Sequence, residues 1–194
     1  MGFLSVLTQA QRWIAERVRP GDAVVDATAG NGSDTLFLAR TVGPGGRVYA
    51  FDVQERALAS TLARLEASAL DEGAKLPAVD LVHAGHERMV ELLPPALHGR
   101  LASVMFNLGY LPGAESPVIT QPGSTLAALN AALGLLRPEG IVTVVVYPGH
   151  EGGREESDAV LAWAAAVPQT VAQAALYRFP QKDASPYLIA LIKK

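Results

Sequence analysis

The chain has 194 residues, of which 49% are hydrophobic, so we expect a single globular domain over residues 1–194. A formal net charge of −3 excludes a general attraction to nucleic acid, so an RNA substrate would need a local basic patch or a partner subunit. The chain has no cysteine, which excludes disulfides and thiolate metal sites. We expect no metal site from its four scattered histidines, no membrane span and no signal peptide, and therefore a cytoplasmic protein.

An amphipathic helix is predicted at the start of the chain, ahead of a Pro20-Gly21 stop. We expect it to pack on a sheet as an N-terminal lid. The apolar positions recur at steps of three and four residues: Phe3, Leu7, Ala10, Ile14 and Val18.

The segment from Val24 to Asp34 is typical of a buried strand, a tight glycine loop and the start of a helix. Gly30 and Gly32 permit positive φ and let the backbone come close to a ligand. The following helix would offer unpaired N–H groups beside it. A nucleotide-like cofactor is the expected occupant, and a tight turn with no ligand is the less favoured interpretation.

Two cofactors compete for this loop. A dinucleotide-binding loop has the pattern G-x-G-x-x-G, but Thr35 stands where its last glycine would be. Asp26, at the end of the strand, would also repel a pyrophosphate. S-adenosylmethionine (SAM) has a sulfonium and an amino group and no phosphate, so it suits carboxylates. The spacing Asp-x-x-x-Gly-x-Gly resembles motif I of class I methyltransferases.

The second predicted strand, 47–52, ends in Asp52, about 20 residues past the glycines, as expected for a carboxylate that binds ribose hydroxyls. A helix over residues 54–69 follows. The third predicted strand, 79–83, leads into Gly85 and His86. The residues after this strand hold the adenine in class I methyltransferases, so His86 could contact the base. A helix-capping histidine is an equally good interpretation.

The fourth predicted strand, 101–107, ends in Asn107 and leads into a loop with Tyr110. Ligands lie outside the carboxyl ends of parallel strands, so this loop should face the methyl donor. Asn107 with Tyr110 resembles a variant of the Asn-Pro-Pro-Tyr motif of amino-methyltransferases. There the asparagine oxygen accepts hydrogen bonds from the target amine, and the aromatic ring walls the pocket. An asparagine that only satisfies a strand end is the weaker interpretation.

The rest of the chain predicts the remainder of a sheet. We expect Ser124 to cap a helix that reaches Leu136, a turn over 137–140, a central strand over 141–147 and a helix over 155–166. Two final strands, 171–179 and 187–192, have too short a link for a helix and should form an antiparallel hairpin. The predicted fold is therefore α/β and Rossmann-like: a seven-stranded, mostly parallel sheet with an antiparallel C-terminal strand and helices on both faces.

Four motifs occur in the order seen in one family: 26–32, 50–54, 107–113 and 147–150. Over essentially its whole length the chain resembles the small class I methyltransferases of the rRNA methylase family. Characterised members of that family methylate the aminomethyl group of a wobble aminomethyl-thiouridine in tRNA. The sequence departs from the family pattern at Ala114-Glu115 and at Glu151-Gly152, which affects the substrate side rather than SAM binding.

The resemblance implies SAM as cofactor and a target-amine site. The implied cofactor contacts are Asp26, Thr28, Gly30, Asn31, Gly32, Asp34, Asp52, Val53, Gln54, Gly85, His86, Asn107 and Gly109. The implied catalytic residues are Asn107, Tyr110 and, on the substrate rim, His150.

Three functions are compatible with these observations: methylation of a modified tRNA uridine, methylation of another RNA or of a small amine, and SAM binding without catalysis. The first is favoured. Its tRNA partner would be held by a few phosphate contacts, assisted by a homodimer. The candidate side chains are Arg12, Arg17, Arg56, Arg88, Arg154 and Arg178.

Overall fold

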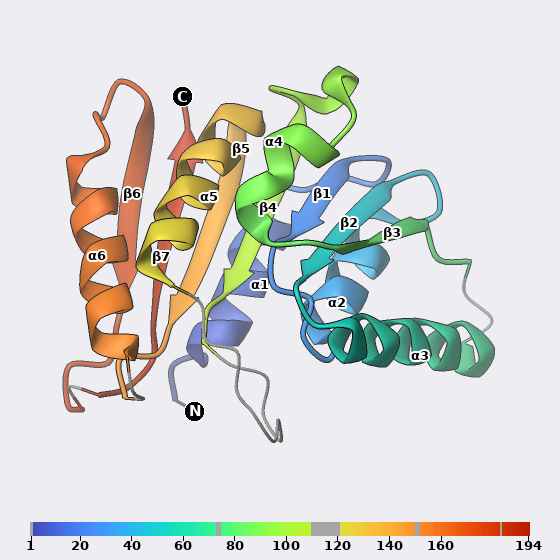
Figure 1. Ribbon diagram of the computed structural model, residues 1–194, viewed down its shortest axis with the longest axis horizontal. Coiled ribbons are helices and arrows are strands. Elements are labelled where there is room, and N and C mark those ends of the chain that lie inside the picture. Colours follow the sequence, from blue (N-terminus) through green and yellow to red (C-terminus); the bar gives the residue numbers. More distant parts are fainter. Residues whose placement is uncertain (1, 73–74, 110–120, 150–151, 183) are drawn as a thin grey trace.

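The computed structural model describes residues 2–72, 75–109, 121–149, 152–182 and 184–194. Within them, seven strands form one sheet in the order β3-β2-β1-β4-β5-β7-β6 (Figure 1). Neighbours from β3 to β5 pair in parallel, and β7 runs antiparallel to both β5 and β6. This arrangement confirms the predicted fold class. The strands are β1 (Ala23–Asp26), β2 (Arg47–Asp52), β3 (Ala78–His83), β4 (Leu101–Asn107), β5 (Leu136–Val146), β6 (Ala172–Tyr177) and β7 (Tyr187–Lys193).

Helices cover both faces of the sheet; in Figure 1, α5 and α6 lie in front of it and α1 and α2 behind it. The front core holds Phe51, Phe106 and Leu129, and the rear core holds Ile14, Leu38 and Met105. The helices are α1 (Val6–Ala15), α2 (Ser33–Val42), α3 (Glu55–Glu72), α4 (Met89–Leu92), α5 (Pro122–Leu135) and α6 (Gly153–Ala166), with short 3-10 turns η1 (His86–Arg88) and η2 (Pro95–Leu97).

The strand order reverses between β1 and β4, because the chain steps outward from β1 to β2 and β3 and then returns to add β4 on the other side. In open α/β sheets, ligands bind outside the carboxyl ends of the strands at such a reversal. Asp26 ends β1 and Asn107 ends β4, so both residues lie at this edge. We call this edge of the sheet the carboxyl rim.

The first helix is shorter than predicted, and its buried side differs in part from the predicted apolar stripe. Ser5 caps α1 by accepting a hydrogen bond from the Thr8 N–H at 3.1 Å, and Val6, Ala10 and Ile14 form its buried side. Phe3, which the apolar spacing placed in this stripe, precedes the helix and is 88% exposed. The prediction was wrong there because an apolar residue at the right spacing need not face the core.

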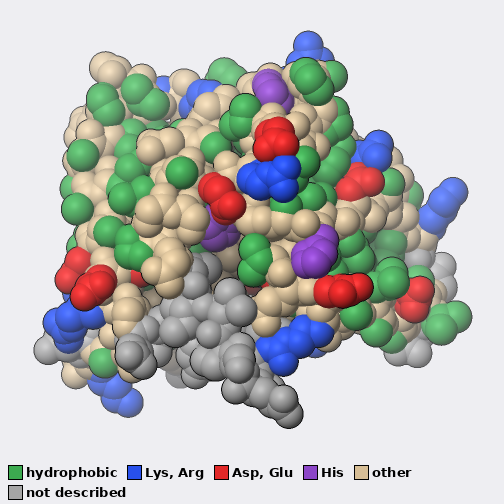
Figure 2. Space-filling model, in the orientation of Figure 1, with side chains coloured by type: hydrophobic (Ala, Val, Ile, Leu, Met, Phe, Trp, Pro, Cys, Tyr) green, Lys and Arg blue, Asp and Glu red, His purple; other side chains and the backbone are tan. Residues whose placement is uncertain are grey.

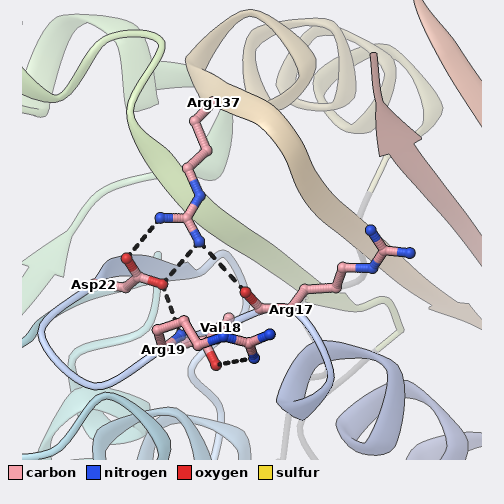
Figure 3. A network of polar contacts seen from close by, with 5 residues as sticks. All are labelled: Arg17, Val18, Arg19, Asp22 and Arg137. Atoms are coloured by element: carbon pink, nitrogen blue, oxygen red, sulfur yellow. Dashed lines mark hydrogen bonds and ion pairs between the residues drawn. The ribbon is translucent and has the colours of Figure 1, made fainter.

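The α5–β5 connection also differs from the prediction. Gln121 is the N-cap of α5, while the Ser124 hydroxyl donates back to the Gln121 carbonyl at 3.0 Å. The expected turn over 137–140 is an irregular start of β5, where the register with β4 shifts and Glu139 has a φ of 63°. The Arg137 side chain from this bulge forms an ion pair with Asp22 (Figure 3).

On the face seen in Figure 2, acidic and basic side chains are interspersed rather than gathered into one basic field. This distribution agrees with the net charge of −3. None of the helices described here is long and apolar enough to cross a membrane.

Candidate functional site

The loop between β1 and α2 is shaped by its two glycines. Gly30 and Gly32 have φ values of 54° and 79°, which L-residues with a Cβ rarely adopt. A Cβ on Gly32 would lie 2.7 Å from the Thr61 Cα of α3. Gly32 is therefore required by the close approach of α3, in addition to any ligand. The Asn31 side chain accepts a hydrogen bond from the N–H of Ser33, the first residue of α2, at 3.2 Å.

Asp52, at the end of β2, is held in place by the neighbouring backbone. One carboxylate oxygen accepts a hydrogen bond from the Gly30 N–H at 2.9 Å, and the other accepts one from the Gln54 N–H at 2.9 Å. Each oxygen can accept further hydrogen bonds, because an ionised carboxylate has about four acceptor positions. The structure thus brings Asp52 and Gln54 to the glycine loop, as the sequence predicts. Val53, between them, is 51% exposed.

Asp26 lies beneath this loop and is only 1% exposed. It accepts a hydrogen bond from the Thr35 hydroxyl at 2.6 Å and one from the Thr28 N–H at 3.1 Å. Burial, and then the nearby Asp34 carboxylate, raise the pKa of Asp26 to about 7. Thr35, which stands where a dinucleotide-binding loop would have its last glycine, links the end of β1 to α2 through its hydrogen bond to Asp26.

A second buried carboxylate, Asp34, belongs to a network of four side chains from different parts of the fold. Asp34, in the first turn of α2, accepts hydrogen bonds from Gln11 Nε2 of α1 at 2.9 Å and from Asn107 Nδ2 at 3.5 Å. Tyr147, which follows β5, donates its hydroxyl hydrogen to Asn107 Oδ1 at 2.8 Å. We call Gln11, Asp34, Asn107 and Tyr147 the amide network.

The amide network fixes the orientation of the Asn107 side chain. An ionised carboxylate can only accept, so the Asn107 NH₂ must face Asp34 and its oxygen must face Tyr147. Burial raises the pKa of the Tyr147 phenol, which keeps it a donor. The Asn107 backbone is held too, because its N–H donates to the Thr28 hydroxyl at 2.8 Å. Asn107 thus presents an oriented acceptor oxygen at the carboxyl rim.

His86 is buried in front of the sheet, beside the end of β1. Its Nδ1 lies 3.2 Å from the Ala27 carbonyl oxygen, and its ring packs edge-on against Phe106. Burial lowers the pKa of His86, so the ring is neutral, with the proton on Nδ1, since a carbonyl only accepts. His86 supports the strand end, and its proposed contact with adenine stays a prediction.

The described residues thus place most of the predicted site at one edge of the sheet. Thr28, Asn31 and Gly109 lie in its loops, and Gly85 precedes the turn that holds His86. Tyr110 and His150, as well as the departures at Ala114-Glu115 and Glu151, lie outside the described residues.

Two members of the amide network, Gln11 and Tyr147, were not predicted as site residues. Tyr147 could have been found, because it follows the carboxyl end of β5, two residues beyond the Val145 partner of Asn107, and residues at such strand ends face the ligand. Gln11 gave no signal, because only the packing of α1 brings it to Asp34.

The acidic side chains at this site fit SAM better than a phosphate-containing cofactor. Asp26, Asp34 and Asp52 place three carboxyl groups around the glycine loop, which favours a cationic ligand with hydroxyl groups. Among the described residues, no group of three or more His, Asp or Glu side chains could hold a metal ion.

Comparison with known proteins places the chain among methyltransferases. The family model described as "Putative rRNA methylase" matches residues 48–193. The chloroplastic tRNA (mnm(5)s(2)U34)-methyltransferase of Arabidopsis thaliana is 38% identical over 183 residues. This alignment covers 91% of the chain and 65% of that relative, so the chain spans about two thirds of its length.

Two solved structures are similar over the whole chain. A Clostridium thermocellum protein that carries the same family description is 37% identical, with a TM-score of 0.90 and complete coverage of both chains. A Streptococcus mutans methyltransferase in complex with SAH is 31% identical, with a TM-score of 0.84 and complete coverage of both. The matched family model, these identities and the shared fold show that the chain belongs to the rRNA methylase family of class I, SAM-dependent methyltransferases.

Proposed function

We propose that this protein transfers the methyl group of SAM to the aminomethyl nitrogen of a modified wobble uridine in tRNA. The 38% identical Arabidopsis thaliana relative, whose name gives this position, supports the substrate. The observation that carries the proposal is the oriented Asn107 amide at the reversal point of the sheet. SAM, when bound, supplies an electrophilic methyl group on a sulfonium.

Asn107 suits an amine substrate because its oxygen is a neutral acceptor. An amide oxygen can accept an N–H of the neutral amine and so turn the nitrogen lone pair away from itself. A carboxylate at this position would instead stabilise the charged ammonium, which has no lone pair to react. Positioning of this kind supplies much of the rate of a direct transfer between two bound reactants. Tyr110 and His150 complete the proposed catalytic set.

The cofactor would be held by residues already fixed by the fold. Asp52 would accept hydrogen bonds from the ribose hydroxyls, while its contacts to the Gly30 and Gln54 N–H groups keep it in place. Of the other proposed contacts, Asp34 and the glycine loop would surround the cationic part of SAM, and the buried Asp26 would act on it from beneath the loop. His86 would face the adenine through Nε2, because Nδ1 is engaged with Ala27.

A small-molecule amine is the second candidate substrate, favoured by the net charge of −3. Two of the arginines predicted to bind phosphates, Arg12 and Arg88, lie in ion pairs with Glu16 and Glu91. RNA binding would therefore rest on few cations, assisted by a cytoplasmic homodimer.

The test is methylation of bulk tRNA isolated from cells that lack the enzyme, with labelled SAM, followed by mass spectrometry of the nucleosides. The expected result is label in one aminomethyl-type uridine and in no other nucleoside. Label in a small-molecule extract but not in tRNA would favour the second candidate and contradict the first.

A further inference from the structure

Four aromatic side chains form a continuous row on the rear face of the sheet. Phe3 packs on Phe179 with ring centroids 6.4 Å apart, Phe179 on Tyr177 at 5.4 Å, and Tyr177 on Trp13 at 6.2 Å. The rings are tilted or edge-on to one another, as aromatic pairs prefer. We call these four residues the aromatic row.

The strand register places the aromatic row beside the candidate site. Asn107 pairs with Val145, Val145 with Leu188, and Leu188 with Tyr177, so one line across four strands joins the two. With strands about 4.8 Å apart, three steps separate the Asn107 and Tyr177 backbones by about 14 Å. Tyr147, the donor to Asn107, packs against the same core cluster as Trp13, Tyr177 and Phe179.

The outer end of the row is exposed yet held in place. Phe3 is 88% exposed and contributes almost nothing to the core. The segment that carries it is fixed, because the Tyr177 hydroxyl donates to the Leu4 carbonyl at 2.8 Å and Ser5 caps α1. Figure 1 shows the N-terminus at the end of the sheet toward which β1 and β4 point, which is the end that holds the carboxyl rim. Trp13, Tyr177 and Phe179 are partly buried, so the row offers the exposed Phe3 ring on a fixed aromatic base, which suggests a binding surface.

We infer that the aromatic row is a stacking surface for unpaired RNA bases next to the target nucleotide; this rests on the proposed function. Proteins recognise single-stranded RNA loops by stacking splayed bases on aromatic rings. The distance of about 14 Å to Tyr177 corresponds to about four stacked-base steps of ~3.4 Å, and Phe3 lies two ring contacts further along the row, so unpaired bases beyond the target would reach it. One exposed cation, Lys182, lies in the link after Phe179 and suits an adjoining phosphate, whereas Arg178 packs over the Tyr187 ring.

The test uses the full-length protein saturated with SAH and a labelled RNA hairpin with an unpaired loop, with fluorescence anisotropy as the readout. Phe3→Ala should weaken binding of the hairpin by roughly 5- to 150-fold, the range for one stacked base. Phe3→Tyr should bind like the wild type, whereas Phe3→Leu, which is apolar but not aromatic, should behave like the alanine variant. The fold loss should be similar at low and high salt, because stacking releases no counterions.

Leu176→Ala is the matched control. Leu176 is a 50% exposed apolar residue next to Tyr177 on the same edge strand, and successive side chains of a strand point to opposite faces. This variant should bind the hairpin normally, and Phe3→Ala should keep its affinity for a fully paired RNA duplex.

Wild-type affinity of Phe3→Ala for the hairpin would overturn the inference, as would full recovery in Phe3→Leu. A change in sedimentation of Phe3→Ala with unchanged RNA affinity would instead identify the row as a contact between two copies of the chain. Methylation of tRNA by the wild type, assayed in parallel, tests the proposed function separately from the proposed stacking surface. If tRNA is methylated while Phe3→Ala binds normally, only the stacking surface is wrong; if tRNA is not methylated, the proposed function itself fails.

Discussion

The two edges of the sheet hold polar networks of opposite kinds. The amino ends of β1 and β5 form what we call the amino edge. There the Arg137 guanidinium donates to both oxygens of Asp22, at 2.7 and 3.0 Å, and to the Arg17 carbonyl at 3.3 Å (Figure 3). Charge there meets opposite charge in a fork geometry that stabilises the fold. At the carboxyl rim, Asp26 and Asp34 accept from hydroxyl, amide and backbone donors, none of which is a cationic side chain.

The difference shows where the protein gives up stability for function. Burial raises the pKa of Asp34, and burial together with Asp34 raises that of Asp26, so ionising these groups opposes folding. A cationic ligand such as SAM would offset this cost, whereas Asp22 and Arg137 need no ligand. Perturbed carboxylates that gather at a reversal point of the sheet are a physical sign of a binding site.

The largest expected effect is on the pH dependence of stability. Asp26 keeps its proton up to about pH 7 in the folded state, but only up to about pH 4 in the unfolded state. The folded state therefore binds more protons between these values, and the free energy of unfolding should fall as pH rises from about 4 to about 7, by up to ~4 kcal/mol. Urea denaturation of the wild type and Asp26→Asn at pH 5 and pH 8 measures this.

The Asp26→Asn variant should lose this pH dependence while Thr35 still has an acceptor. Its stability relative to the wild type should therefore improve between pH 5 and pH 8. An equal difference at the two pH values would contradict the raised pKa.

Asp52→Ala should weaken SAM binding by roughly 1–3 kcal/mol, because hydroxyl donors of the ligand lose a charged acceptor. Isothermal calorimetry measures it directly. Asp80→Ala removes a carboxylate from the neighbouring strand β3, where it pairs with Arg47, and should bind SAM normally. Wild-type affinity in Asp52→Ala would refute the ribose assignment.

Arg137→Ala should lower the free energy of unfolding by about 1–2 kcal/mol, because Asp22, which is 15% exposed at its side chain, loses its charged partner. The turnover of the folded variant should be unchanged, since the pair lies at the opposite edge from the site. Arg47→Ala, which breaks the more exposed pair with Asp80, should have a smaller effect on stability. A turnover defect in Arg137→Ala would contradict the claim that the amino edge contributes to stability alone.

The smallest expected effect is that of Tyr147→Phe, about a 10-fold loss of kcat with little change in KM, because the Asn107 oxygen loses the donor that orients it. The ring itself is kept, so packing should survive. Tyr187→Phe removes another buried hydroxyl, bonded to the Ser157 carbonyl, and should leave turnover unchanged. Equal kcat values for Tyr147→Phe and the wild type would limit the amide network to a structural contribution.

Much of the fold could be predicted because local patterns and long-range packing agree. The β-branched run 141–146 is buried on both faces of the sheet, and the short link before Tyr187 allows only an antiparallel return. The failures occur where tertiary context decides. Phe3 has the spacing of a core residue but lies in solvent, and Ser124 has the chemistry of an N-cap while Gln121 occupies that position.

In the candidate site, the residues at strand ends could be predicted from the sequence, but their hydrogen-bond partners could not. Asp52 and Asn107 each close a strand, so the rule for parallel sheets brings them to one edge. The contact between Gln11 and Asp34 depends on how α1 docks, which no local pattern encodes. The burial of Asp26 against Thr35 likewise follows only from the assembled sheet.

The central claim is that the oriented Asn107 amide presents the neutral amine to the methyl donor. The most direct test is single-turnover methyl transfer by Asn107→Ala and Asn107→Asp at saturating SAM and tRNA across pH. Both variants should bind SAM normally and lose roughly a hundredfold or more in rate, the scale of a small misplacement in a near-attack geometry. Asn107→Asp should also need a higher pH, because its carboxylate favours the ammonium form. A near-normal rate in Asn107→Ala would contradict the claim.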